Sequence, residues 1–144
     1  SSPRVRASSG GGYGDKDAMS LDILEEVGFE RDSSVPYKTA SVLPHGYLKR
    51  LELARLIALK SEVFILDELF SGLSIAEVTS ITPIIEKLLL DGKTIIMVEH
   101  RLKELFRIAD KVIVLNFGKK IKEGVPKEIL EDEEVKKAYL GVEV

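Results

Sequence analysis

The stretch VFILDE, residues 63–68, decides the fold class of this chain, because four apolar residues end abruptly in two acids. A short apolar run bounded by polar residues predicts a buried strand. Open parallel sheets bind ligands at the edge where the carboxyl ends of their strands meet. We therefore expect Asp67 and Glu68 to lie at a functional edge, with their side chains on opposite sides of the sheet.

Segments with helical and strand patterns alternate around this strand. Apolar runs predict two further strands, at residues 94–98 and at residues 112–115, the second leading through a turn into Ile121. Helical spacing predicts helices at residues 21–27, 46–59, 75–89, 102–108 and 127–140, the last with a break near Asp132. The alternation predicts an α/β fold, with a three-layer, mainly parallel sheet and a terminal hairpin.

Two of these helices carry more detailed signals. The sequence SIAE, residues 74–77, has the form of a capping box, which predicts a helix beginning just after Ser74. The helix at residues 46–59 has an apolar stripe, with Arg50 outside it. The residues of this stripe are Leu51, Ala54, Ile57 and Ala58.

The composition excludes several classes of partner and site. The chain has 144 residues and a net charge of −3, which gives no basic footprint for nucleic acid, so we expect no nucleic-acid partner. No apolar run approaches the ~20 residues that span a bilayer, so we expect a soluble protein without direct membrane insertion. The absence of cysteine excludes disulfides and thiolate metal sites.

Four residues at predicted element ends are candidates for chemistry, each with a plainer alternative. Asp67 could hold magnesium through water and Glu68 could activate an attacking water, or both could begin a solvated loop. His100, after the strand at residues 94–98, could donate to a γ-phosphate or be an ordinary surface residue. Gly46 could let a helix start approach an anion, or form a plain N-terminal turn with Pro44.

The glycine cluster at residues 10–14 does not qualify as a phosphate-binding loop. Lys16 is followed by Asp17, where Ser or Thr would be needed for the metal, and no strand is predicted before the glycines. We interpret residues 1–17 as a flexible or irregular segment.

In their order along the chain, these segments resemble the C-terminal half of an ABC-type ATPase, from about Leu21 to the end. The strand with Asp67 and Glu68 is similar to the Walker B motif with its catalytic glutamate, and His100 is similar to the switch histidine. The residues similar to the signature motif are Leu43, Pro44, His45, Gly46 and Tyr47. The residues similar to the D-loop are Ser71, Gly72, Leu73 and Ser74.

The resemblance implies a partial P-loop NTPase-like domain. Residues 18–60 would form part of the helical signature subdomain, and residues 61–144 the C-terminal part of the ATPase core, with a hairpin and helices at its end. The implied cofactors are ATP and Mg²⁺. Both need the Walker A half for tight binding, and its Gly-x₄-Gly-Lys-Ser/Thr pattern is absent here. We therefore expect the chain alone to be inactive.

The resemblance also implies partners. A second ATP-binding subunit would complete the site in a dimer, and membrane permease subunits would hold the protein at the cytoplasmic face of the membrane.

Residues 43–58 and AYLG, residues 138–141, look most like ATP-binding subunits of branched-chain amino-acid importers. The chain departs from the family at three positions, where Pro44 replaces serine, Tyr47 replaces glutamine and Leu69 replaces proline.

Two other interpretations remain open. The chain could be a non-hydrolytic interaction module of the same fold, or the C-terminal half of a DNA-repair or chromosome ATPase, although residues 1–17 show no coiled-coil heptads.

The ABC interpretation makes a geometric prediction. Gly46 and Glu68 should lie more than ~10 Å apart, too far to contact one phosphate, whereas His100 should lie near Glu68. The signature residues would then act on a nucleotide held by the second subunit.

Overall fold

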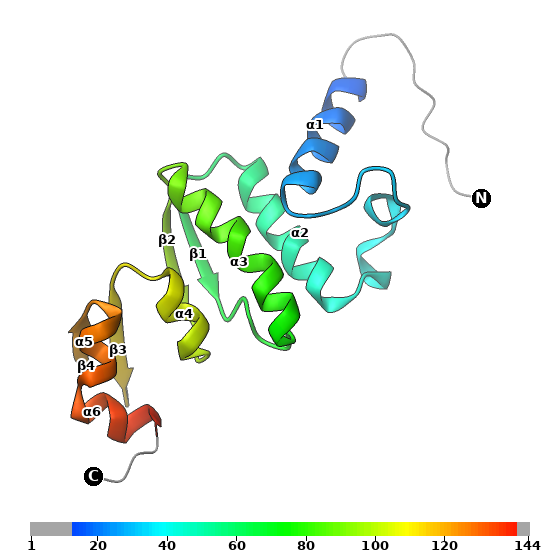
Figure 1. The fold of residues 1–144 in the computed structure, drawn as a ribbon. Coiled ribbons are helices and arrows are strands. Elements are labelled where there is room, and N and C mark those ends of the chain that lie inside the picture. Colours follow the sequence, from blue (N-terminus) through cyan, green and yellow to red (C-terminus); the bar gives the residue numbers. More distant parts are fainter. Residues whose placement is uncertain (1–12, 141–144) are drawn as a thin grey trace. The chain divides into compact units, whose positions relative to one another are not determined.

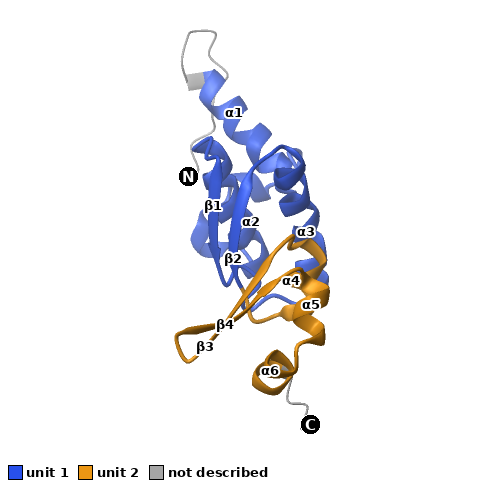
Figure 2. Ribbon diagram, turned by 90° about the vertical axis from the view of Figure 1, so that its left-hand side faces the viewer, with its two compact units in different colours: residues 1–98 blue, residues 99–144 orange. Residues whose placement is uncertain are grey.

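A computed structural model describes residues 13–140 of the chain (Figure 1). The chain forms two compact units, residues 1–98 and 99–144, which Figure 2 colours separately. The elements of the first unit are α1 (Tyr13–Glu26), α2 (His45–Ala58), β1 (Val63–Asp67), α3 (Ile75–Leu90) and β2 (Thr94–Val98), with short 3-10 turns at Val35–Tyr37 and Ala40–Val42. Those of the second unit are α4 (Leu102–Ile108), β3 (Val112–Asn116), β4 (Lys119–Gly124), α5 (Pro126–Glu131), α6 (Glu133–Val135) and a π-helical turn at Lys136–Leu140.

The first helix is longer than its apolar pattern predicts. α1 begins at Tyr13, so residues 13–17 are helical, although we expected an irregular segment there. Backbone hydrogen bonds can extend a helix beyond the residues that it buries, which an apolar pattern does not report. α1 ends before Gly28, whose φ of +88° suits the left-handed position after a helix, as predicted. The expectation for residues 1–12 lies outside the described residues.

The strand that decides the fold class pairs in parallel with β2. The register places Val63 opposite Thr94 and Asp67 opposite Val98. The Glu68 amide donates to the Val98 carbonyl at 2.8 Å, which continues the pairing one residue beyond β1. The carboxyl ends of both strands therefore lie at the same edge, as the sequence predicts.

The two faces of this parallel pair differ. Phe64 and Leu66 are buried, whereas the alternate residues Val63 and Ile65 are 52% and 69% exposed. α2 and α3 lie on one side of the strands (Figures 1 and 2), and in the described part of this unit no helix covers the other side. Two of the three expected layers are thus present, and the prediction of burial is correct for one face only.

Local signals explain why α3 begins and ends where it does. The Ser74 hydroxyl accepts from the Glu77 amide and the Glu77 carboxylate accepts from the Ser74 amide, so the predicted capping box is confirmed. The helix continues through Pro83 and packs its apolar face inward. It ends at a turn in which Gly92 has a φ of +83°. The buried residues of this face are Val78, Ile81, Thr82, Ile85 and Leu88.

The second unit is built on the predicted terminal hairpin. β3 and β4 pair antiparallel through a turn in which Phe117 and Gly118 both have positive φ, the backbone that two-residue hairpin turns require. The predicted break near Asp132 is confirmed, because its side chain caps α6 by accepting hydrogen bonds from the Glu134 and Val135 amides. The buried core of the hairpin and helices comprises Val112, Val114, Ile129 and Val135.

Candidate functional site

Glu68 occupies a constrained turn at the end of β1. Its φ of +50° is left-handed, a conformation that costs a residue with a side chain about 1–2 kcal/mol. The turn is held on both sides, since the Glu68 amide bonds to Val98 and the Glu68 carbonyl accepts from the Ser71 amide at 3.0 Å. Glu68 lies outside β1, which ends at Asp67, so strand alternation does not set its direction, and the expectation that the two acids point to opposite sides of the sheet stays a prediction. Backbone strain of this kind is characteristic of functional sites.

The two acids suit a magnesium ion only in part. Asp67 and Glu68 are exposed, and carboxylate oxygens are ligands that magnesium prefers. No group of three His, Asp or Glu residues that could hold a metal occurs among residues 13–140. A magnesium contact from Asp67 through water stays a prediction.

The sequence Gly92-Lys93-Thr94 matches the last residues of a phosphate-loop pattern, but it does not lie where a phosphate loop lies in a fold. Lys93 pairs with Glu62 at 2.8 Å, and Thr94 opens β2. A phosphate loop instead lies between a strand and the helix that follows it. These residues therefore close the turn from α3 into the sheet.

The predicted D-loop residues do form a loop, and it contacts the start of α2. Nε2 of His45 lies 3.0 Å from the Ser71 carbonyl oxygen. Gly72 has a φ of +74°, and a Cβ added there would lie 2.9 Å from the same His45 nitrogen. Gly72 is therefore required both for the backbone turn and for the approach of the imidazole.

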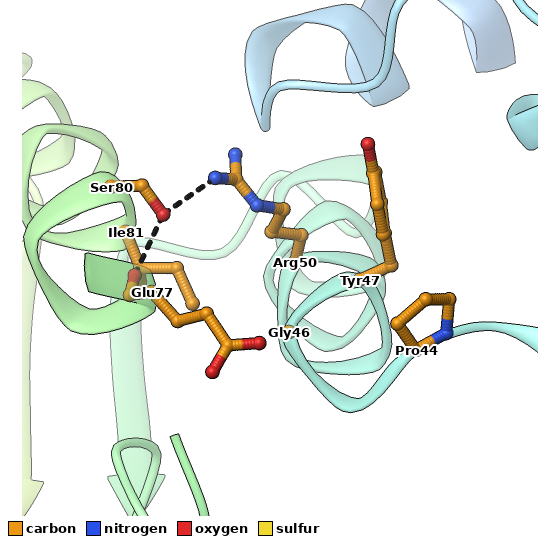
Figure 3. A pocket seen from close by; sticks show the side chains of 7 residues that line it. All are labelled: Pro44, Gly46, Tyr47, Arg50, Glu77, Ser80 and Ile81. Atoms are coloured by element: carbon orange, nitrogen blue, oxygen red, sulfur yellow. Dashed lines mark hydrogen bonds between the residues drawn. The ribbon is translucent and has the colours of Figure 1, made fainter. Parts of the chain in front are cut away.

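A second contact ties α2 to the start of α3. α2 begins one residue earlier than expected, at His45, and its N-cap residue Pro44 provides no side-chain cap. Gly46 is buried, and a Cβ added to it would lie 2.7 Å from Oε1 of Glu77. Figure 3 shows the Glu77 side chain directed toward Gly46. Hydrogen bonds from the Ser74 backbone and side chain lower the pKa of Glu77, and His45 and the Gly46 backbone lower this pKa further.

Arg50 links three helices of the first unit beside a small hollow of about 170 Å³. Its guanidinium donates to the Val27 carbonyl after α1 at 2.7 Å and to the Ser80 hydroxyl on α3 at 2.8 Å (Figure 3). As expected, Arg50 is not among the buried residues of α2, but its two contacts were not predicted. Its partners lie 23 and 30 residues away, so no local sequence pattern could reveal them. The hollow is lined by Pro44, Gly46, Tyr47, Arg50, Glu77, Ser80 and Ile81.

Two more residues of α2 differ from the expected stripe. Leu53 is fully buried although we did not include it in the stripe, whereas Ala58 is exposed although we did.

Tyr47, where the family usually has glutamine, packs edge-on against Phe29 with ring centroids 5.1 Å apart. An aromatic contact thus occupies this position of the signature segment.

His100 follows β2 directly, two residues beyond Val98, as the sequence predicts. It belongs to the second unit, whereas Glu68 belongs to the first. The proximity of His100 to Glu68 therefore stays a prediction. The separation of Gly46 from Glu68 also stays a prediction.

Comparison with known proteins shows similarity to ATP-binding proteins of ABC transporters. The model of the family "Branched-chain amino acid ATP-binding cassette transporter" matches residues 119–144. The chain is 33% identical over 119 residues to the high-affinity branched-chain amino acid transport ATP-binding protein BraF of Pseudomonas aeruginosa, covering 82% of this chain and 46% of BraF. It is 34% identical over 122 residues to the lipopolysaccharide export system ATP-binding protein LptB of Escherichia coli, covering 83% of this chain and 48% of LptB.

Solved structures agree on the fold. An ATP-binding cassette of an ABC transporter in its ADP conformation matches 96% of this chain and 54% of its own, with a TM-score of 0.76 and 24% identity. A component of an ABC transporter complex from Clostridium perfringens matches with a TM-score of 0.69 and 28% identity, over 90% of this chain and 51% of its own. The expected resemblance to the C-terminal portion of an ABC transporter ATP-binding subunit is therefore confirmed.

The chain spans about half the length of BraF and LptB. These relatives include a protein named for branched-chain amino acid transport and one named for lipopolysaccharide export, so the similarity does not fix the transported substance or the direction of transport. Within residues 13–140, no helix combines the length and the apolar character needed to cross a bilayer.

Proposed function

We propose that this chain is the C-terminal part of an ATP-binding subunit that hydrolyses ATP to drive solute transport through a membrane permease. The observation that carries the proposal is the parallel pairing of β1 with β2. It places Asp67, and Glu68 beside it, at the carboxyl edge of the strands. Ligands of open parallel sheets bind at this edge.

Each candidate residue has a role in this proposal. Asp67 holds Mg²⁺ through water, and Glu68 orients or deprotonates the attacking water. His100 donates a hydrogen bond to the γ-phosphate of ATP as charge develops there. The D-loop, residues 71–74, links this edge to α3.

The signature residues, Leu43 to Tyr47, act on the nucleotide of a second subunit. Pro44 has no hydroxyl to offer a phosphate, so backbone amides at the start of α2 make these contacts. The working unit is therefore a dimer, held at the cytoplasmic face of the membrane by permease subunits.

We propose branched-chain amino acids as the imported solute. The family match over residues 119–144 and the similarity to BraF support this choice. Similarity to LptB supports export as a second candidate. Vesicles containing the subunit and its permease can separate the two. Uptake of leucine driven by ATP supports import, whereas ATP hydrolysis without leucine uptake contradicts this substrate.

The catalytic proposal is tested by Glu68→Gln in the complete subunit. The substitution keeps the size of the side chain but removes its charge and basicity, so turnover should be abolished while ATP binding is preserved. Glu86→Gln, an exposed position on α3, is the matched control and should hydrolyse ATP normally. The measurements are steady-state phosphate release and equilibrium ATP binding. Near-normal turnover by Glu68→Gln would contradict the role assigned to Glu68.

A further inference from the structure

The backbone of Ser71 joins two parts of the first unit that are far apart in sequence. Its amide donates to the Glu68 carbonyl at 3.0 Å, and its own carbonyl oxygen lies 3.0 Å from Nε2 of His45. We propose that His45 is a positioning residue that couples the start of α2 to the turn at Glu68 through the Ser71 peptide. This inference rests on the proposed function and adds to it a route between the two nucleotides of the dimer.

The His45 ring lies close against the loop, although its side chain is exposed to solvent. A Cβ added at Gly72 would lie 2.9 Å from His45 Nε2 and 3.2 Å from its Cδ2, which leaves no free space on that side of the ring. The left-handed φ of Gly72 fixes the loop in the conformation that presents the Ser71 carbonyl. Glycine at position 72 therefore permits both the turn of the loop and the close approach of the His45 ring.

A second tie acts in parallel with the first. The Ser74 amide donates to Oε2 of Glu77 at 2.7 Å, and the same carboxylate group approaches Gly46. The loop at residues 71–74 thus lies near the start of α2 at two places, at His45 through a hydrogen bond and at Gly46 through the Glu77 carboxylate. We expect a displacement of the α2 start to reach the loop through these two contacts.

This coupling has a specific consequence under the proposed function. The start of α2 contacts the nucleotide of the second subunit, whereas Glu68 acts on the nucleotide of its own subunit. Binding at one site would therefore adjust the Glu68 turn of the other site through His45 and Ser71. Loss of the His45 hydrogen bond should reduce turnover and cooperativity between the sites more than it reduces ATP binding.

The bond depends on a donor at Nε2 rather than on charge. A carbonyl oxygen accepts only, so Nε2 must carry hydrogen, which it does in the protonated ring and in one neutral tautomer. Glu77 is the acid whose charge acts on His45 from α3. A neutral amide of similar reach should replace the imidazole, which a role based on charge would not allow.

The test uses the complete subunit with Mg²⁺ and ATP, and compares His45→Ala, His45→Gln and wild type. His45→Ala should lower kcat about fivefold, the rate equivalent of one neutral hydrogen bond, and lower the Hill coefficient, with KM changed less than about twofold. His45→Gln should recover at least half of kcat and of the Hill coefficient. Arg55→Ala, an exposed position on the same helix, is the control and should match wild type.

Three outcomes count against the inference. Wild-type kcat and Hill coefficient in His45→Ala, or a His45→Gln variant as slow as His45→Ala, would overturn it while leaving the proposed function intact. If His45→Ala fails to fold, His45→Phe keeps a ring without the donor and should show the same loss. Absence of ATP hydrolysis in the wild-type subunit would overturn the proposed function, and this inference with it.

Discussion

At Glu68, a structural cost falls on the residue to which we assign a chemical role. Its left-handed backbone is unfavourable for a residue with a side chain, and hydrogen bonds to Val98 and from Ser71 hold it there. The strain fixes the carboxylate one residue beyond the strand, which a regular strand residue could not do. Lys60 and Phe117 also have positive φ, but they lie in connecting turns, so strain alone does not identify a site.

The residue-scale prediction concerns His100. In the complete subunit, His100→Ala should lower kcat by about 10²-fold while ATP affinity falls less than about threefold, because a γ-phosphate contact matters most as charge develops in the transition state. Phosphate release and nucleotide binding measure the two quantities. If His100 had only a structural role, His100→Ala would instead have a lower melting temperature than wild type, with normal activity per folded molecule.

At the scale of elements, local sequence predicted what local interactions determine. The capping box at Ser74 and Glu77, the turn at Gly92 and the break at Asp132 each depend on residues within four positions, and the structure has all three. The partners of Arg50 and His45 lie 23 to 30 residues away. No period or spacing encodes such contacts, so the link between α2 and the loop after β1 could not be predicted.

An ion-pair cluster on the hairpin of the second unit predicts a pH dependence. Hydrogen bonds and charge from Lys111 and Lys120 lower the pKa of Glu123 from 4.5 to about 2. Because the folded pKa is lower than the unfolded one, Glu123 stabilises the fold above pH 4.5, and this contribution is lost as the pH falls toward 2. Glu123→Gln should therefore be less stable than wild type at pH 7, and the difference should shrink below pH 4.5.

Urea unfolding between pH 3 and pH 7 measures this difference. Glu131→Gln, an exposed position on α5, is the control and should follow the wild-type curve. A difference between Glu123→Gln and wild type that stays constant across this range would show that the ion pairs do not stabilise the fold.

At the scale of the whole molecule, the parallel strands present an apolar face to solvent. Ile65 on β1 is 69% exposed and Val98 on β2 is 55% exposed, although both are residues that sheets usually bury. The ABC relatives are about twice as long as the region matched here. We infer that in a complete subunit this face is covered by further chain, which explains why four consecutive apolar residues predicted burial on both faces.

The absence of a phosphate-loop pattern limits what these 144 residues should do by themselves. Most of the affinity of such ATPase sites comes from backbone amides and a lysine that surround the phosphates, and the sequence has no Gly-x₄-Gly-Lys-Ser/Thr loop to provide them. Under the proposed function, Asp67, Glu68 and His100 would act on a phosphate only after it is held in place. We therefore predict that the 144-residue chain alone binds ATP weakly and has no appreciable ATPase activity.

Calorimetric titration with ATP and Mg²⁺, together with a phosphate-release assay, tests this prediction on the purified chain. The same chain joined to the N-terminal half of its subunit is the positive control and should regain both tight binding and turnover. Restored turnover that Glu68→Gln then abolishes would assign the activity to this edge of the sheet. Magnesium-dependent turnover by the isolated chain, at about the 1–10³ s⁻¹ of ordinary enzymes, would instead show that the phosphates are held by groups within these residues.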